Sequence, residues 1–297
     1  MRYLVGIDLG GTHIKAAAFA HDGAVLHRET QPTRDGDRVA GVPAWADTIR
    51  VLIETFASRL GAPAGRVGLA APGLPAGDGR SILSMPVRMD GLEGLDWGRL
   101  LGRHDGVRVI NDAHAALLGE AWQGAARGRT DAVLLTLGTG VGGAILADGR
   151  LLRGTIGRAG HLGHLSLDVR GPAGILGTPG ALEELIGECS LESRSGGRFR
   201  TTRDLLGAAD AGDAEAATVW AQSVRALACA IASFINILDP EVVIVGGGIT
   251  EAGDRLWRPL ALEMDQVEWR PGGHRVPIVR AELGGWAGAY GAAAPTP

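Results

Sequence analysis

The 297-residue chain is poor in cysteine and in aromatic residues. Its two cysteines, Cys189 and Cys229, are too few and too far apart for a disulfide framework or a cysteine zinc site, which is typical of a reducing compartment. Aromatic residues make up 4% of the chain, against 48 glycines. This balance indicates tight turns and close backbone approaches more than a bulky aromatic core.

Long basic or apolar runs are also missing. The net charge is −4 and no run of Lys or Arg occurs, so we expect no nucleic-acid partner and favour small polar ones. The apolar run from Tyr3 to Ile7 is short and meets Asp8, and no later segment reaches about 20 apolar residues without a charge. We therefore expect a soluble, cytoplasmic protein without a signal peptide or membrane span.

Lysine occurs once, as Lys15, although Lys and Arg together number 29. One interpretation is a compositional drift to arginine that missed one site. The other is that a compact ammonium beside a phosphate loop is not easily replaced by a guanidinium fork. The sequence leaves both open.

The clearest feature present is a repeated plan of strand, glycine turn, strand, Asp-Gly hairpin and strand. The first copy comprises the run 3–9, the turn Gly10-Gly11-Thr12, the run 14–19, the turn Asp22-Gly23 and Val25-Leu26. The second comprises the run 133–137, the turn Gly138-Thr139-Gly140, the run 141–146, the turn Asp148-Gly149 and Leu151-Leu152. Such a duplicated turn suits two facing lobes that hold a polyphosphate between them, so phosphoryl transfer is the leading hypothesis.

Further periodicity predicts an α/β protein with mostly parallel sheets covered by helices. Helices are expected at 43–60, 113–125, 182–186, 214–238 and 286–294, and further strands at 67–71, 107–110 and 241–245. We expect the last helix to pack back on the first lobe. The predicted lobes are residues 1–113 plus 284–297, and residues 114–283.

Three glycine-rich turns are candidate phosphate or nucleoside sites. Backbone amides of Gly10 and Gly11 and the hydroxyl of Thr12 suit an anion, and Asp8 before them suits magnesium, held directly or through water. Gly138, Thr139 and Gly140 form a second phosphate clamp, and Gly246, Gly247 and Gly248 would lie flat against a nucleoside. The alternatives are an ordinary tight hairpin at the first turn and a plain strand-to-helix turn at the third.

Asn111 and Asp112 stand where a strand is expected to end and a helix to begin. Asp112 suits an N-cap, the commonest use of Asp at such a place. It equally suits a general base that takes the proton of an attacking hydroxyl while Asn111 binds the neighbouring one. The two roles are compatible, and the flanking phosphate turns favour the catalytic one.

Six motifs in order resemble the ROK family of bacterial sugar kinases and repressors, nearly end to end. They are Asp8-Leu9-Gly10-Gly11-Thr12, Ala71-Pro72-Gly73, Asn111-Asp112 with Gly119-Glu120, Leu137 to Gly143, Gly160-His161-Leu162-Gly163-His164, and Gly246-Gly247-Gly248. The resemblance implies an actin-like, ribonuclease-H-like α/β fold, with two lobes around a central cleft. It also implies a homodimer or larger assembly.

By this resemblance, Asp112 deprotonates a sugar hydroxyl, usually the 6-hydroxyl, for in-line attack on the γ-phosphate of Mg·ATP. Gly73, Asn111, His161, His164 and Glu183 would surround the sugar, as would Asp112 itself. Lys15 would join the three glycine turns around the nucleotide.

The chain departs from the family where a structural zinc is usual. Many members have three cysteines here, and this chain has Gly174, Leu176 and Ala181 instead. A single histidine without thiolates cannot complete a tetrahedral structural site, so we expect no zinc and a loop held by packing. A new metal site at His161 and His164 is the rival, and no further ligand with matching spacing is visible.

His161 replaces a glutamate that usually touches the sugar. An imidazole can donate as well as accept, which alters the hydroxyl or acyl group that is welcome near the anomeric end. The substrate is then a hexose or an N-acetylhexosamine and not necessarily plain glucose. The alternative is a solvent-facing histidine with no substrate role.

Two other functional classes remain. A sugar-responsive regulator would bind sugar without turnover, and retention of Asp112 and of both phosphate turns argues against it. An actin-fold ATPase driving a partner would not need Asn111, Asp112 or Glu183. Polyphosphate in place of ATP is a further option within the kinase hypothesis.

Overall fold

A computed structural model describes residues 3–85, 89–103 and 105–295. Contacts divide the chain into two compact units. The first unit comprises Met1–Gly128, Gly149–Ala159 and Glu282–Pro297, and the second comprises Arg129–Asp148 and Gly160–Ala281.

The elements of the first unit are β1 (Leu4–Leu9), β2 (His13–Phe19), β3 (Val25–Pro32), β4 (Arg38–Val39), β5 (Val42–Pro43), α1 (Ala44–Leu60), β6 (Arg66–Ala71), β7 (Leu74–Pro75), β8 (Ile82–Ser84), α2 (Trp97–Leu100), β9 (Arg108–Asn111), α3 (Asp112–Gln123), β12 (Arg150–Leu151), η5 (Gly284–Trp286) and α9 (Ala287–Ala293). Those of the second unit are β10 (Ala132–Leu137), β11 (Val141–Ala147), η1 (Leu162–His164), α4 (Leu182–Ile186), η2 (Glu188–Ser190), α5 (Leu191–Arg194), α6 (Thr202–Asp210), α7 (Ala214–Leu238), β13 (Val242–Gly246), η3 (Gly248–Ala252), α8 (Asp254–Val267), η4 (Pro271–Gly273) and β14 (Ile278–Arg280).

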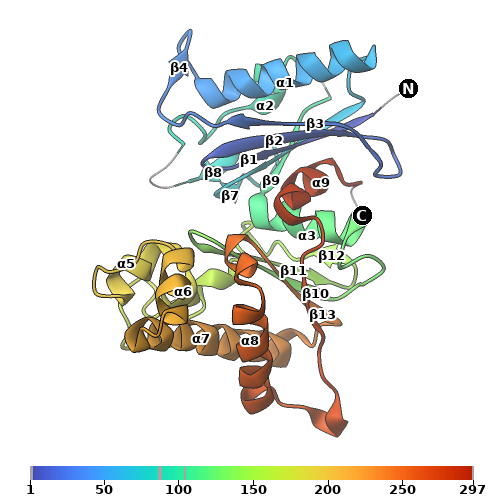
Figure 1. Cartoon of the computed structure of the whole chain (residues 1–297). Coiled ribbons are helices and arrows are strands. Elements are labelled where there is room, and N and C mark those ends of the chain that lie inside the picture. Colours follow the sequence, from blue (N-terminus) through green and yellow to red (C-terminus); the bar gives the residue numbers. More distant parts are fainter. Residues whose placement is uncertain (1–2, 86–88, 104, 296–297) are drawn as a thin grey trace. The chain divides into compact units, whose positions relative to one another are not determined.

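The first unit is built on a sheet in the order β3-β2-β1-β6-β9. β1 and β2 form the predicted hairpin, in which Asp8 lies opposite Lys15, while β6 and β9 follow as parallel strands. Helix α1 lies along one face of this sheet (Figure 1) and buries Trp45, Ile49 and Phe56 against it. It ends at Gly61, whose φ of 69° is the left-handed conformation that glycine adopts without a Cβ clash.

Helix α9 covers the other face of that sheet at very short range because glycines face it. A methyl group on Gly6 or Gly68 would collide with the carbonyl oxygen of Ala289 or Ala292. Helix α9 also packs against α3, where a methyl on Gly291 would strike the Ala115 carbonyl. Rings of Phe19, Trp122 and Tyr290 close the contact, with centroids 4.5 to 6.1 Å apart.

Because α3 packs against α9, the boundary between the two units differs from the predicted one. The sequence predicted that the second lobe begins at residue 114, inside α3. The contacts instead place all of α3 and the segment Gly149–Ala159 in the first unit. The predicted return of the last helix to the first lobe agrees with the position of α9.

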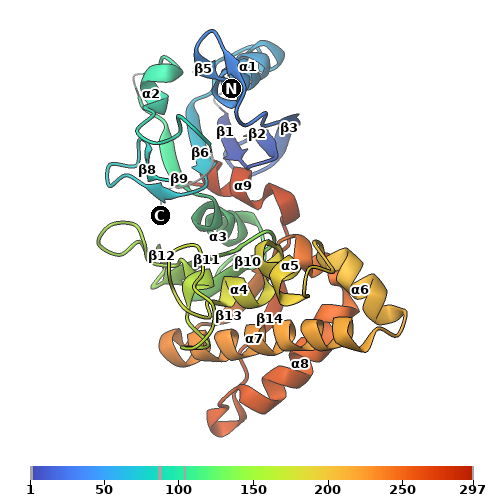
Figure 2. The same cartoon turned by 90° about the vertical axis from the view of Figure 1, so that its left-hand side faces the viewer.

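The second unit repeats the plan of the first. Its strands follow the order β11-β10-β13-β14, with β10 and β11 antiparallel and the next two strands parallel. Helices α7 and α8 lie side by side against it (Figure 2). The core joins Val133 and Leu135 of β10 and Val243 of β13 to Leu227 and Ile231 of α7.

By length and composition alone, helix α7 is long and apolar enough to cross a membrane. It begins after Asp213, whose carboxylate accepts the backbone N–H groups of Glu215 and Ala216. Its buried face forms the core of the second unit. A core helix therefore accounts for its composition.

Candidate active site

The first glycine turn joins β1 to β2 and is fastened at its base. The Gly10 N–H donates to the carbonyl of His13 at 3.0 Å, and the Thr33 hydroxyl donates to the Gly10 carbonyl at 2.6 Å. Gly11 and Thr12 are exposed at the tip. The amide of Gly10 therefore serves the hairpin itself, and Gly11 and Thr12 present the exposed polar groups.

Asp8, at the end of β1, is partly buried in a crowded place. A methyl group on Gly288 of α9 would lie 2.7 Å from its carboxyl carbon. Burial first, and then the negative charge of Asp112, raise its pKa to about 7, although the positive charge of Lys15 opposes both. The structure thus brings the two predicted carboxylates into electrostatic contact within the first unit.

Lys15 lies opposite Asp8 on β2. Its Nζ donates to the carbonyl oxygen of Gly285 at 2.8 Å, which ties the hairpin to the turn that starts α9. The chain's one lysine therefore lies beside a carboxylate whose charge it stabilises. Neither interpretation of Lys15 from the sequence is decided by this contact.

Asn111, and not Asp112, is the N-cap of α3. Its Oδ1 accepts the N–H groups of Ala113 and His114 at 3.0 and 3.1 Å, and its Nδ2 donates to the Gly73 carbonyl at 3.1 Å. The N-cap alternative for Asp112 was therefore wrong. Asp112 occupies the first helical position, exposed, with Oδ1 accepting the Ala113 N–H at 2.8 Å.

That hydrogen bond joins Gly73 to Asn111, and the sequence assigned both residues to one site. The φ of Gly73, 94°, lies in the left-handed region, so glycine is required there. Residues Gly73, Asn111 and Asp112 form one rigid corner where β6, β9 and α3 meet.

The second glycine turn joins β10 to β11 and is held by the segment after α4. The N–H groups of Glu188 and Cys189 donate to the carbonyls of Gly138 and Thr139 at 3.0 and 2.8 Å. Thr139 itself is exposed. The turn is therefore a fixed feature whose tip is accessible.

Glu183 lies beneath this same turn. Its Oε2 accepts the backbone N–H of Val141 at 2.8 Å, and a methyl group on Gly140 would collide with it. The sequence predicted Glu183 as a sugar contact and gave no sign of this bond. The residue thus joins α4 to the start of β11.

His161 and His164 are half-buried, on and just before the short helix η1. Their rings stack with centroids 6.5 Å apart and planes inclined by 17°. The Leu182 N–H donates to the Leu165 carbonyl at 2.8 Å, which sets this segment beside the start of α4 and so near Glu183. The segment of His161 and His164 is therefore a neighbour of α4, the helix that carries Glu183.

The third glycine turn follows the buried strand β13. Gly247 has a φ of 92°, and a methyl group there would lie 2.6 Å from the backbone nitrogen of Leu137, the residue before the second turn. Gly248 begins η3, and the Thr250 hydroxyl donates to the Gly247 carbonyl at 2.7 Å. The second and third turns thus lie together at one edge of the second sheet.

The loop that usually holds zinc is closed by its own backbone. The Gly174 N–H donates to the Thr178 carbonyl at 2.9 Å, and the Ser166 hydroxyl donates to the Pro179 carbonyl at 2.6 Å. The Gly180 N–H donates to the Pro172 carbonyl at 2.8 Å. The absence of zinc stays a prediction.

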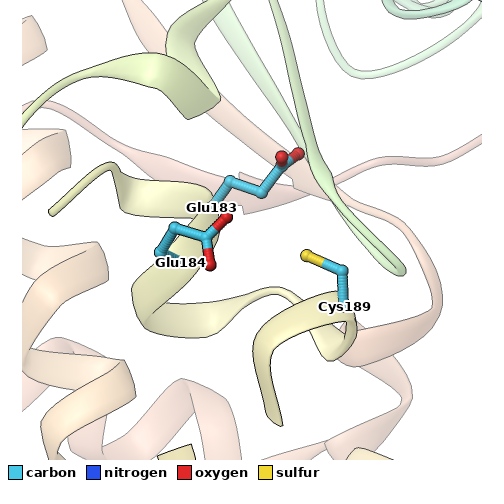
Figure 3. Close-up of side chains that lie close together, drawn as sticks. All are labelled: Glu183, Glu184 and Cys189. Atoms are coloured by element: carbon cyan, nitrogen blue, oxygen red, sulfur yellow. The ribbon is translucent and has the colours of Figure 1, made fainter. Parts of the chain in front are cut away.

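A group of metal-ligand type that the sequence did not suggest is Glu183, Glu184 and Cys189 (Figure 3), with ligand atoms within 4.8 Å of one another. Burial and the two carboxylates raise the pKa of the Cys189 thiol to about 11, so it stays protonated at neutral pH. In the part of the chain that the structure describes, neither His161 nor His164 belongs to a three-ligand group. Nothing therefore supports the rival metal site at the two histidines.

Two sheets of matching order, each with a glycine turn between its first two strands, define the actin-like ATPase fold. The family model described as "ROK family" matches residues 4–296. The chain belongs to the ROK family, as its motifs predicted.

Named relatives and a solved structure cover most of the chain. It is 34% identical over 284 residues to a glucokinase from Thermotoga maritima, covering 86% of this chain and 85% of that one. It is 30% identical over 294 residues to an N-acetylmannosamine kinase from Shigella flexneri, covering 98% and 97%. A ROK family glucokinase from Streptomyces griseus, solved in complex with glucose and AMPPNP, is 27% identical with a TM-score of 0.78, covering 98% of both chains.

Proposed function

We propose that this protein is an ATP-dependent sugar kinase that phosphorylates a hexose or an N-acetylhexosamine at its 6-hydroxyl. The predicted kinase class agrees with relatives named glucokinase and N-acetylmannosamine kinase. The solved relative that holds glucose and an ATP analogue supports ATP as the donor.

The observation that carries the proposal is the corner of Gly73, Asn111 and Asp112. Asn111 is held by three hydrogen bonds, and the Asp112 carboxylate accepts the Ala113 N–H, so both side chains are fixed at the start of α3. A fixed, exposed carboxylate at a helix start is what a general base requires. A protein that only senses sugar would not require a base there.

In the proposed reaction, Asp112 takes the proton of the sugar hydroxyl as its oxygen attacks the γ-phosphorus. A new O–P bond forms, the bond from phosphorus to the β–γ bridging oxygen breaks, and ADP leaves with the electron pair. General-base help of this kind contributes about 10²–10⁴ in rate. Positioning and charge neutralisation provide much of the remainder.

The donor set around Asp8 fits magnesium. Burial and the negative charge of Asp112 raise the pKa of Asp8 to about 7, although Lys15 opposes them. A bound cation would therefore stabilise the ionised carboxylate of Asp8. A hard dication prefers carboxylate oxygen and water. When bound, magnesium would neutralise charge on the phosphates, and Asp8 would hold it directly or through water.

The remaining predicted residues receive their roles from the same proposal. The turns at Gly10–Thr12, Gly138–Gly140 and Gly246–Gly248 bind the nucleotide, with Lys15 beside the first. In the second unit, His161, His164 and Glu183 bind the sugar. We further propose a cytoplasmic location, a homo-oligomer, and no nucleic-acid partner.

The experiment is coupled ADP release by the purified chain with Mg·ATP. The acceptors tested are glucose, mannose, N-acetylglucosamine and N-acetylmannosamine, with a control that contains no sugar. The same panel is repeated with polyphosphate as the donor, and the sugar phosphate formed is then measured. Sugar-dependent release supports the kinase and identifies its acceptor. Release without sugar would support an ATPase instead, and sugar binding without turnover of either donor would support a regulator.

A further inference from the structure

A hollow of about 320 Å³ opens in the first unit beside β9, outside the three glycine turns. Three arginines line it: Arg80 from the turn after β7, Arg108 at the start of β9, and Arg153 after β12. Asn111 and His114, at the corner where α3 begins, also line it. The volume lies in the range of small-molecule sites.

The charge of this hollow is not balanced. Arg108 is half-buried, and its Nη1 donates to the carbonyl of Ala294 at 3.3 Å, while the neighbouring Arg66 donates to that of Ala293 at 2.7 Å. Burial lowers the pKa of Arg108, and the positive charges of Arg66 and Arg153 lower it further. These guanidinium groups therefore repel one another in a partly desolvated place.

Two acidic residues of the rim, Asp78 and Asp105, offset only part of the charge of the three arginines. Asp105 forms an ion pair with Arg103 at 2.7 Å, and Asp78 accepts the backbone N–H of Arg80 at 3.0 Å. Within residues 3–85, 89–103 and 105–295, no ion pair involves the side chains of Arg66, Arg80, Arg108 or Arg153. An anionic ligand would supply the missing counter-charge.

We propose that this hollow is a binding site for the phosphate monoester of a sugar. Guanidinium groups bind phosphate oxygens in bidentate fashion, and Arg80, Arg108 and Arg153 approach the hollow from three separate segments. Inorganic phosphate alone would leave most of the volume empty. Pro75 and Leu151 provide apolar surface for the carbon face of a ring.

The choice of a sugar phosphate rests on the proposed function, because such a compound is the product formed at the neighbouring Asp112. The choice of a phosphate group rests on the arginines alone. Because the hollow and the catalytic corner share β9 and the start of α3, a bound product would contact the element that carries the base. Occupancy of the hollow would therefore follow the concentration of product, and the bound product would act on the element that carries Asp112.

The test is calorimetric titration of the full chain, with the catalytic site filled beforehand by saturating AMPPNP and acceptor sugar. The probes are the hexose 6-phosphate, inorganic phosphate and the unphosphorylated sugar. We compare wild type with the double variant Arg80→Ala/Arg153→Ala, whose two side chains are exposed and outside the core. The matched control is Arg99→Ala, an exposed arginine of the same unit that does not line the hollow.

We expect one hexose 6-phosphate per chain in wild type and in Arg99→Ala, with affinity reduced about tenfold or more in the double variant. Binding should weaken as KCl is raised. Equal affinity in wild type and the double variant, or no binding to wild type, would overturn the site. Equal affinity for inorganic phosphate and the sugar phosphate would overturn the sugar part of the proposal.

Failure of the kinase proposal gives a different result. ADP release without added product should be the same in the double variant and in wild type. If the chain releases no ADP with any sugar, the titration is run without AMPPNP and acceptor. Arginine-dependent phosphate binding would then remain, while the kinase proposal and its choice of a sugar phosphate would fail.

Discussion

Glu183 and Val141 are joined by a hydrogen bond of 2.8 Å from the backbone N–H of Val141 to the Glu183 carboxylate. Glu183 is on α4 and Val141 begins β11, immediately after the second glycine turn. A residue predicted to bind sugar therefore also holds the start of the strand that follows the turn for which we propose nucleotide binding. Its substitution should affect both ligands.

For this bond we predict that Glu183→Ala raises KM for ATP about tenfold or more, since a hydrogen bond to a charged acceptor is lost. Glu183→Gln keeps an oxygen that can accept the Val141 N–H, so its KM for ATP should stay close to wild type while its KM for sugar rises. The neighbouring Glu184→Gln is the control. An unchanged KM for ATP in Glu183→Ala would show that the bond does not position the turn.

Asp112→Asn is the test of the base. The amide keeps the shape of the side chain but cannot take a proton, so kcat should fall by about 10²–10⁴. Sugar affinity, measured by titration calorimetry, should stay within about threefold of wild type because the carboxamide still forms hydrogen bonds. Asp90→Asn, an exposed acid of the same unit, serves as control. A near-normal kcat for Asp112→Asn would refute the assignment.

Asp8 predicts an unusual pH dependence of stability. Its pKa is raised from 3.8 to about 7 in the folded chain, so folded Asp8 keeps its proton where the unfolded chain has lost it. The unfolded state then binds fewer protons, and the free energy of unfolding falls as pH rises from about 4 to about 7. Urea midpoints of wild type and Asp8→Asn without magnesium should show this fall in wild type alone.

Bound magnesium should oppose the fall in the free energy of unfolding with rising pH. Because protons and the cation compete for the Asp8 carboxylate, the magnesium concentration for half-maximal activity should rise as pH falls below about 7. At pH 8, magnesium should raise the unfolding midpoint of wild type more than that of Asp8→Asn. Identical magnesium responses in the two proteins would place the cation elsewhere.

Lys15→Arg examines why one lysine is present among arginines. The Lys15 Nζ lies 2.8 Å from the carbonyl oxygen of Gly285. A guanidinium group is larger than an ammonium, so arginine at this position should displace the start of α9. We expect a lower unfolding midpoint and a higher KM for ATP, both measured against Arg99→Lys as an exposed reciprocal swap. Wild-type behaviour of Lys15→Arg would favour compositional drift.

His161→Glu restores the residue that is usual in the family. The imidazole donor is lost, so the ratio of kcat/KM for N-acetylhexosamine to that for the plain hexose should change by about tenfold. The exposed His274→Glu is the matched control in the second unit. If the ratio is unchanged, His161 has no substrate role.

Most of the fold could be predicted from the sequence because its signals are local. The glycine turns, the Asp-Gly hairpins and the apolar periodicity of α1 and α7 each depend on neighbouring residues. The position of α3 was not predictable, since it depends on Gly291 and Ala115, which lie far apart in the chain. Small residues that permit close packing carry little periodic signal.

Sequence motifs proposed the residues of the candidate site but did not predict the contacts that these residues form. Motif order identified Asn111 and Asp112, but it did not show that Asn111 caps α3 through Oδ1 while its Nδ2 donates to Gly73. The bond from Val141 to Glu183 spans 42 residues and has no sequence signature. The arginines of the hollow come from three separate segments, so only the structure brings them together.

Helix α9 is the last helix of the chain, yet it covers the sheet that begins with β1. During synthesis from the N-terminus, one apolar face of the first sheet stays uncovered until α9 has been made. The second unit, Arg129–Asp148 and Gly160–Ala281, lies entirely before α9 in the chain. We expect the second unit to fold first on the ribosome, which makes the nascent first unit the natural client of a chaperone.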